Sequence, residues 1–184
     1  MNGGSTEYAR GAWITPLGVI EAWWGPDGVR NLRLPTRPPD SAPVPGPVLR
    51  KGDCIFNGAD NADAVKTGEE LENFLSAFFS RQPAQAPFLD ESAGTAFERL
   101  IWRQTREIQW GSTIGYGELA SLVGSAGAAR AAGRALGKNP LPLLTPCHRV
   151  VLAGYVSPEV NAGGFSCGTG IKRWLLSFEH NFPN

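Results

Sequence analysis

The clearest chemical feature of the chain is a cysteine directly followed by a histidine, Cys147 and His148, in the segment NPLPLLTPCHRVV. A thiolate is a strong nucleophile, but a free thiol has a pKa of about 8.5 and is mostly protonated at neutral pH. Reactivity at Cys147 therefore needs a nearby base or positive charge. Adjacent side chains of an extended strand point to opposite faces. We expect either a bend in the backbone here or a water that bridges the thiol and the imidazole.

An isolated cysteine is usually an inert part of a hydrophobic core, and we interpret Cys54 and Cys167 in this way. Cys147 differs because proline, histidine and arginine surround it and a basic helical segment precedes it. Three cysteines without a C-x-x-C pair argue against a disulfide framework or a metal site. The first ten residues lack the apolar core of a signal peptide. We therefore expect an intracellular protein, in the cytoplasm or the nucleus.

The N-terminal part of the sequence predicts a small sheet and a helix. Residues 11–34 contain the turn motifs TPLG and GPDG, which indicate three short strands, and the proline-rich residues 35–48 indicate a loop. Residues 67–81 predict a helix that begins with a capping box of Thr67 and Glu70. The apolar residues of this helix share one face: Leu71, Phe74, Leu75, Phe78 and Phe79.

The pattern changes to mainly helical from residue 92. Thr95 and Glu98 form a capping box at the start of one helix. Helices at 116–123 and 127–137 flank a glycine turn, the outline of a helix-turn-helix. Two sets of residues are predicted to be buried: Phe97, Leu100, Ile101 and Ile108 in the first helix, and Ile171, Trp174, Leu175 and Phe178 in a last helix at 169–179.

These elements predict an α+β fold with two domains. Residues 1–88 would form an N-terminal α/β domain of sheet and helix, ending in a linker at 82–87. Residues 89–184 would form a helical C-terminal domain with a winged-helix-like helix-turn-helix. No apolar run approaches the ~20 residues of a membrane span, so we expect no membrane partner.

The charge pattern points to a local nucleic-acid contact. The formal net charge is zero, so no chain-wide positive field marks such a partner. Residues 116–150, however, carry four Arg and Lys side chains and one Glu. A solvated helix face would explain these charges, but Arg130 lies among small residues that would let a duplex approach closely. A long arginine on such a helix suits the minor groove, where a side chain can insert into the base stack.

The segment PCHRV at 146–150, with NPLP ahead of it, resembles the active-site signature of the O6-alkylguanine-DNA alkyltransferases, the methylated-DNA–protein-cysteine methyltransferases. The similarity extends through GYGELASLVG, AARAAGRALGKN and IKRWLLSFE, and covers most of residues 92–180. The N-terminal part resembles the family mainly through TPLG and the three strands.

The resemblance implies a role for each residue of the reactive centre. Cys147 would accept the alkyl group, His148 would take the thiol proton through a water, and Glu179 would orient the histidine. Asn139 would join the recognition helix to the active-site loop. Tyr116 would donate a proton or hydrogen bond to the departing guanine.

The resemblance also implies residues that bind the base and the DNA. The carbonyl of Val150 would contact the guanine amino group, Ser166 would lie near O6, and Lys172 would approach from the last helix. Pro142 and Phe165 would complete the substrate pocket. The DNA contacts would come from the second helix of the helix-turn-helix: Arg130, which replaces the extruded base, with Arg134, Ala129 and Gly133.

The implied reaction is DNA repair by irreversible, single-turnover transfer of a methyl or larger alkyl group to Cys147. The group would come from O6 of guanine, and also from O4 of thymine, in a flipped-out base of double-stranded DNA. The transfer needs no cofactor and no metal. We expect a monomer and leave open cooperative assembly on DNA.

The sequence departs from the family pattern in the lid of the pocket. Residues 163–170 read GGFSCGTG, where family members often have tyrosine followed by SGG. The N-terminal zinc site of some members is not expected, because only Cys54 and no histidine precede His148. Three alternatives remain: a non-repairing module that binds damaged DNA, an engineered self-labelling tag that accepts benzylguanine, and a cysteine hydrolase.

Overall fold

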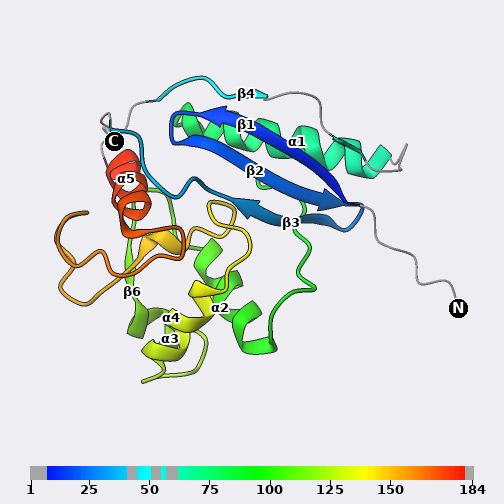
Figure 1. Ribbon diagram of the computed structural model, residues 1–184. Coiled ribbons are helices and arrows are strands. Elements are labelled where there is room, and N and C mark those ends of the chain that lie inside the picture. Colours follow the sequence, from blue (N-terminus) through cyan, green and yellow to red (C-terminus); the bar gives the residue numbers. More distant parts are fainter. Residues whose placement is uncertain (1–7, 41–44, 51–54, 57–61, 181–184) are drawn as a thin grey trace, which may run out of the picture. The chain divides into compact units, whose positions relative to one another are not determined.

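The computed structural model describes residues 8–40, 45–50, 55–56 and 62–180 (Figure 1). The chain divides into two compact units, one formed by Met1–Leu34 and Pro45–Asp90 and the other by Pro35–Val44 and Glu91–Asn184. The predicted α+β fold class is confirmed. The predicted domain ranges, 1–88 and 89–184, stay a prediction. Cys54 and residues 41–44 of the predicted loop lie outside the described residues.

The first unit is built on an antiparallel sheet. The sheet contains β1 (Ala9–Thr15), β2 (Gly18–Gly25) and β3 (Gly28–Arg33) in the order β3-β2-β1, with β4 (Leu49–Arg50) and β5 (Ile55–Phe56) paired to β1. The three predicted strands are thus confirmed. Each turn ends in a glycine with positive φ, Gly18 at 120° and Gly28 at 109°, a conformation that glycine adopts without a side-chain clash.

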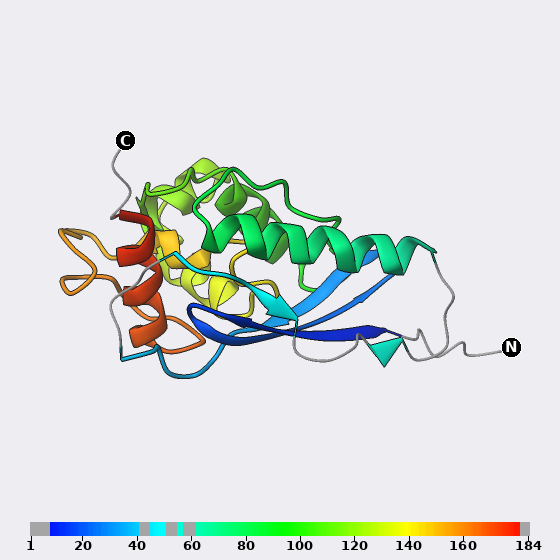
Figure 2. The ribbon, with the colours of Figure 1, turned by 90° about the horizontal axis from the view of Figure 1, so that it is seen from above.

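The helix α1 (Ala62–Phe79) lies along this sheet (Figure 2). Two fully buried tryptophans join the layers: the indole of Trp24 donates to the carbonyl of Ala64 at 2.7 Å, and that of Trp13 donates to Glu72 at 3.2 Å. The predicted start of the helix is wrong. Thr67 lies inside it, and its hydroxyl donates to the carbonyl of Asp63. The five residues predicted to face inward are all buried.

The second unit is mainly helical. Its elements are α2 (Ala96–Arg106), α3 (Tyr116–Leu122), α4 (Ala129–Gly137), the 3-10 turn η1 (Cys147–Arg149), α5 (Thr169–His180), and a parallel pair of short strands, β6 (Ile114–Gly115) and β7 (Val150–Val151). The helices α3 and α4 confirm the two short helices predicted from the sequence. None of the helices in the described part of the chain has both the length and the apolar character needed to cross a bilayer.

The start of α2 follows the sequence prediction, but its buried stripe does not follow it completely. The backbone N–H of Thr95 donates to the Glu98 carboxylate at 2.7 Å, and the N–H of Glu98 donates to the Thr95 hydroxyl at 3.3 Å, which confirms the capping box. Ile101 and Ile108 are buried, whereas Leu100 is 49% exposed, so its predicted burial is wrong. In α5 all four predicted residues are buried.

Candidate active site

The backbone bends sharply at the predicted nucleophile. Cys147, His148 and Arg149 form the turn η1, in which the N–H of Cys147 donates to Thr145 and the N–H of Arg149 donates to Pro146. All ten residues from 141 to 150 are buried. Of the two arrangements expected from the sequence, the structure contains the bent backbone. In an extended strand, adjacent side chains point to opposite faces. In a turn this restriction is absent, so the thiol and the imidazole can belong to one site.

Asn139 connects the end of α4 to the thiol. Its side-chain N–H groups donate to the carbonyl of Thr145 at 2.9 Å and to the sulfur of Cys147 at 3.1 Å, and its carbonyl oxygen accepts from the N–H of Leu141 at 3.0 Å. One buried amide thus fixes the loop that precedes the nucleophile. Its bond to sulfur stabilises the thiolate, because a hydrogen bond to the charged form favours that form.

The Cys147 thiol is protonated in the resting protein. Burial raises its pKa to about 11, and the nearby Cys167 thiol acts in the same direction, whereas Asn139 and Lys172 oppose the shift. A protonated thiol is a weak nucleophile. Reaction at Cys147 therefore requires a base that removes the proton when the substrate is in place.

His148 is suited to be that base. Its ring is fully buried, and its Nε2 lies 2.8 Å from the Glu179 carboxylate. Burial lowers the pKa of His148, with Arg149 and Lys172 acting in the same direction and Glu179 opposing them. A neutral imidazole that donates from Nε2 to a carboxylate carries its lone pair on Nδ1. Among the described residues, that Nδ1 atom has no hydrogen-bond partner, so it can accept a proton.

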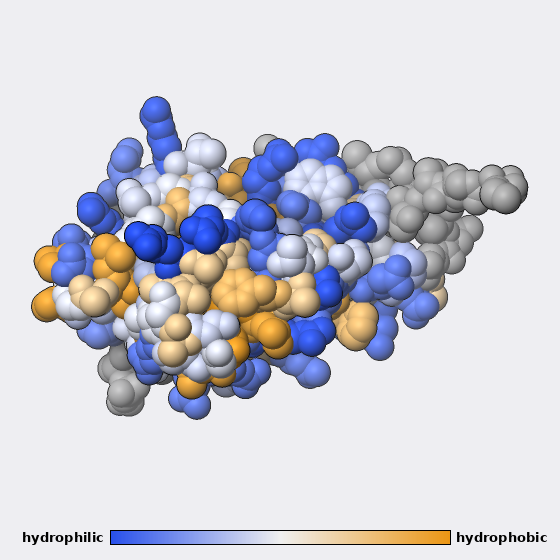
Figure 3. All heavy atoms as spheres, turned by 90° about the horizontal axis from the view of Figure 1, so that it is seen from below, coloured by the Kyte–Doolittle hydropathy of each residue, from blue (hydrophilic) through white to orange (hydrophobic). Residues whose placement is uncertain are grey.

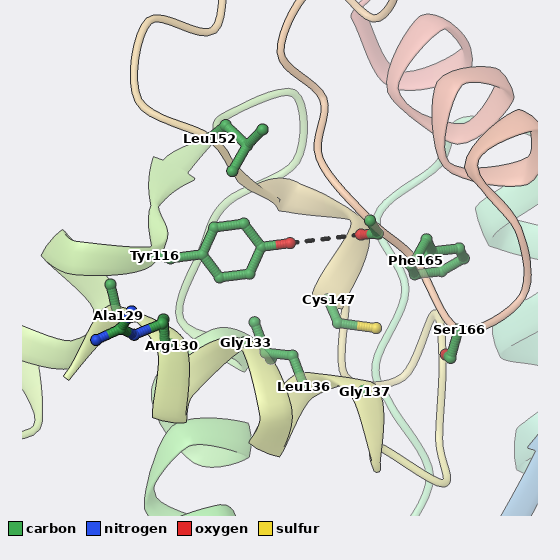
Figure 4. Close-up of a pocket in the computed structure, with 11 residues that line it drawn as sticks. Tyr116, Ala129, Arg130, Gly133, Leu136, Gly137, Cys147, Leu152, Phe165 and Ser166 are labelled. Atoms are coloured by element: carbon green, nitrogen blue, oxygen red, sulfur yellow. Dashed lines mark hydrogen bonds between the residues drawn. The ribbon is translucent and has the colours of Figure 1, made fainter.

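The sulfur opens onto a cavity of about 480 Å³ in front of α4 (Figure 4). Seven of the predicted site residues line it: Tyr116, Ala129, Arg130, Gly133, Cys147, Phe165 and Ser166. The volume falls in the range of ~300–1,000 Å³ typical of small-ligand sites. The thiol is therefore accessible to a planar ligand the size of a base, although its residue is only 4% exposed.

Four further residues line the cavity and were missed from the sequence: Leu136, Gly137, Leu152 and Gly164. Leu136 and Gly137 lie one helical turn beyond Gly133, so helical spacing could have indicated them. Leu152 and Gly164 come from a loop and carried no such signal. Seven predicted residues do not line the cavity, and three of them, His148, Lys172 and Glu179, make buried hydrogen bonds of the site. Arg134 is exposed on α4, Asn139 contacts the thiol from behind, and Pro142 and Val150 are buried.

Lys172 connects the strand β7 to the lid of the pocket, residues 163–170. Its ammonium donates to the carbonyl of Val150 at 2.6 Å, to the carbonyl of Gly164 at 3.2 Å and to the Tyr116 hydroxyl at 3.4 Å. Burial lowers the pKa of Lys172 to about 8. Burial also raises the pKa of Tyr116, and Cys147 adds to this shift, so the phenol stays protonated and can donate. The carbonyl of Val150 keeps one lone pair for a ligand.

The surface around α4 is mixed in character. Arg130 and Arg134 are exposed on α4, and the inner face of that helix buries Ala132, Ala135 and Leu136. Figure 3 shows apolar side chains among strongly hydrophilic ones on one face of the molecule. Such a surface fits a chain with zero net charge. The exposed charged side chains of α4 are those of Arg130 and Arg134.

The chain is similar to known proteins in sequence and in structure. The family described as 6-O-methylguanine DNA methyltransferase, DNA binding domain, matches residues 96–181. A probable methylated-DNA–protein-cysteine methyltransferase of Acanthamoeba polyphaga mimivirus is 40% identical over 120 residues, which cover 65% of this chain and 76% of that protein. The human methylated-DNA–protein-cysteine methyltransferase is 28% identical over 185 residues, covering 94% and 81%.

The solved structures agree with the sequence relatives. The crystal structure of Mycobacterium tuberculosis OGT in complex with DNA has a TM-score of 0.67 and 28% identity, and the match covers 93% of this chain and 92% of that one. The relatives, the fold and the cavity at Cys147 lead to one assignment. The chain belongs to the methylated-DNA–protein-cysteine methyltransferase family.

Proposed function

We propose that this protein repairs DNA by moving a methyl or larger alkyl group from O6 of a flipped-out guanine, or O4 of thymine, to the sulfur of Cys147. The observation that carries the proposal is a buried thiol that opens onto a base-sized cavity beside Arg130. In the transfer, a bond forms between sulfur and the alkyl carbon, and the bond from that carbon to oxygen breaks. The thioether is stable, so each molecule reacts once.

The thiol proton needs a path to a base. A water between the Cys147 sulfur and the free Nδ1 of His148 would provide this path, and Glu179 would stabilise the imidazolium that forms. The product guanine regains a proton as it leaves, so the proton balance closes without net release. General base catalysis of this kind contributes roughly 10²–10⁴-fold to a rate. The transfer needs no metal or cofactor.

Hydrogen-bond donors at the cavity wall would stabilise the leaving group. The oxygen of guanine gains negative charge as the carbon leaves it, and hydrogen-bond donors aimed at that charge lower the barrier. Tyr116 supplies a protonated hydroxyl at the cavity wall, and Lys172 lies behind it. The remaining carbonyl lone pair of Val150 would accept from the guanine amino group.

The lid sets the space for the alkyl group. Phe165 and Ser166 line the cavity, and Pro142 would support the buried turn ahead of Cys147. A larger or smaller group at position 165 would change which alkyl groups fit. Substrate range beyond methyl is therefore a property of this lid.

Binding to double-stranded DNA would be centred on α4. Arg130 lines the cavity and is exposed, so it can occupy the space of the base that enters the pocket. Flipping a base costs a few kcal/mol, and contacts of this kind offset that cost. Ala129 and Gly133 are small, so DNA can approach the surface of α4 closely. Arg134 can contact a phosphate. We propose that the protein acts as a monomer on DNA that contains O6-alkylguanine.

Intact mass spectrometry tests this function. The protein is mixed with a duplex that carries one O6-methylguanine, and we expect a gain of one CH2 on the peptide that contains Cys147. Cys147→Ala should bind the duplex without any gain, and the matched control Cys167→Ala should still accept the methyl group. Binding without a mass change in the unsubstituted protein would instead indicate a non-repairing damage-binding module. Repetition with benzylguanine and with O4-methylthymine measures the substrate range.

A further inference from the structure

Arg149 donates three hydrogen bonds within the buried site, yet the alkyl transfer assigns it no role. Its Nε donates to one oxygen of Glu179 at 2.9 Å, its Nη2 donates to the other at 2.9 Å, and its Nη1 donates to the carbonyl of Ile108 at 2.6 Å. The guanidinium also lies over the ring of Trp110 at 5.7 Å. A two-bond fork between arginine and carboxylate is strong and fixes the orientation of both groups.

The fork leaves the Glu179 carboxylate little freedom. One oxygen accepts from His148 and from Arg149, and the other accepts from Arg149 and from the N–H of Gly111 at 3.3 Å. The donors come from η1 and from the segment between α2 and β6, whereas the carboxylate belongs to α5. Burial alone would raise the pKa of Glu179, but His148 and Arg149 outweigh it and lower the pKa to about 2. The carboxylate is therefore charged at any working pH.

A charged carboxylate beside a buried imidazole has an unwanted effect on a base. It favours the imidazolium, and a histidine that is already protonated cannot take the thiol proton. Arg149 places a compensating positive charge in the same cluster. Among the described residues, the charged groups that act on His148 are Glu179, Arg149 from η1 and Lys172 from α5. Tyr155 and His180 line a small cavity with Glu179.

We infer that Arg149 is a positioning residue that holds Glu179 for His148 and offsets its charge, so that His148 stays neutral and able to accept the thiol proton. The inference rests on the proposed alkyl transfer to Cys147. It separates two effects of one side chain. The fork sets the geometry of the carboxylate, and the positive charge sets the protonation state of the imidazole.

Two substitutions separate these effects. Arg149→Met removes both the charge and the fork, whereas Arg149→Lys keeps the charge and loses the fork. Arg103→Met is the control, because Arg103 also pairs with a carboxylate, Glu91, through two guanidinium nitrogens, and it belongs to α2. The single-turnover transfer rate is measured for each protein from about pH 5 to about pH 9, a range that spans the usual histidine pKa of about 6.5.

The expected profiles follow from the sign of the charge. Removing a positive charge favours the protonated imidazole and raises the His148 pKa, so the acid limb of the Arg149→Met profile should move to higher pH. Its rate should fall at least about tenfold relative to the control near pH 6 and recover toward pH 9. Arg149→Lys, like the unsubstituted protein, should show no loss of rate from protonation of His148 across this range, but its rate should be lower at every pH. An Arg149→Met rate that is lower by the same factor at every pH would reduce Arg149 to a structural role.

A direct titration keeps the inference testable if Arg149→Met does not fold. The chain has two histidines, so NMR of isotope-labelled imidazoles resolves His148 against the exposed His180 as a reference signal. In the unsubstituted protein and in Arg149→Lys, the His148 signal should remain that of a neutral ring across the same pH range. Protonation of His148 near neutral pH in the unsubstituted protein would overturn the inference. Because this readout does not need transfer, it separates a failure of the inference from a failure of the proposed function.

Discussion

The two units of the chain bury different kinds of side chain. Among the described residues, the buried polar side chains of the first unit are Thr15 and Thr67. The second unit buries eight polar or charged ones: Glu98, Thr105, Asn139, Thr145, His148, Arg149, Lys172 and Glu179. A buried charge destabilises a fold unless it is paired and hydrogen-bonded. The second unit thus accepts a stability cost that the first unit avoids.

The difference teaches where function lies in this molecule. The first unit follows the usual rules of a stable core, with two buried tryptophans whose indole N–H groups are both hydrogen-bonded. In the second unit, most of the buried polar and charged side chains gather around Cys147: Asn139, Thr145, His148, Arg149, Lys172 and Glu179. Departures of this kind are typical of functional sites.

The largest expected effect comes from breaking the buried charge cluster. Glu179→Gln keeps the size of the side chain but removes the charge that pairs with Arg149 and orients His148. We expect transfer to slow roughly 100-fold or more and the free energy of unfolding to fall by about 3–5 kcal/mol. Single-turnover kinetics and urea unfolding measure the two losses. An unchanged transfer rate would remove Glu179 from the proton path.

A substitution in the first unit should affect stability alone. Trp13→Ala empties a fully buried site, and a loss of about 3–5 kcal/mol in the free energy of unfolding is expected. The transfer rate of the folded molecules should stay within about twofold, because the site residues belong to the second unit. Urea unfolding and transfer kinetics on the same sample check this. A large rate loss in a fully folded sample would show that the first unit takes part in the chemistry.

The smallest expected effect concerns the surface of α4. Arg130→Ala should slow repair in duplex DNA about tenfold, because the inserted side chain helps to hold the base out of the stack. Its reaction with free O6-benzylguanine should not change, since a free base needs no flipping. Arg134→Ala is the matched control and should mainly weaken binding and its salt dependence. Equal losses on duplex and free base in Arg130→Ala would rule out the insertion of Arg130 into the base stack.

The sequence predicted most helices and strands, and it failed where a local pattern was ambiguous. Thr67 and Glu70 have the spacing of a capping box, but the helix formers that precede them let α1 begin at Ala62. Leu100 is three residues from Phe97, but it does not share the buried face of Ile101 and Ile108, and it is exposed.

The candidate site divides in a similar way. A family resemblance suggested Cys147, His148 and Glu179 together, and the structure places the last two in hydrogen-bond contact. The part played by Arg149 could not be read from the sequence, because its partners Ile108 and Glu179 are 41 and 30 residues away. Leu152 and Gly164 lacked a signal for the same reason, since a loop brings them to the cavity.

The most direct test of the central claim is the stoichiometry of transfer. The protein is incubated with an excess of duplex that contains O6-methylguanine, and both repaired bases and methylated protein are counted by mass spectrometry. We predict that repair stops at one base per protein molecule and that the methyl group is found on the sulfur of Cys147. Continued repair beyond one base per molecule, or a methyl group on another residue, would contradict the account.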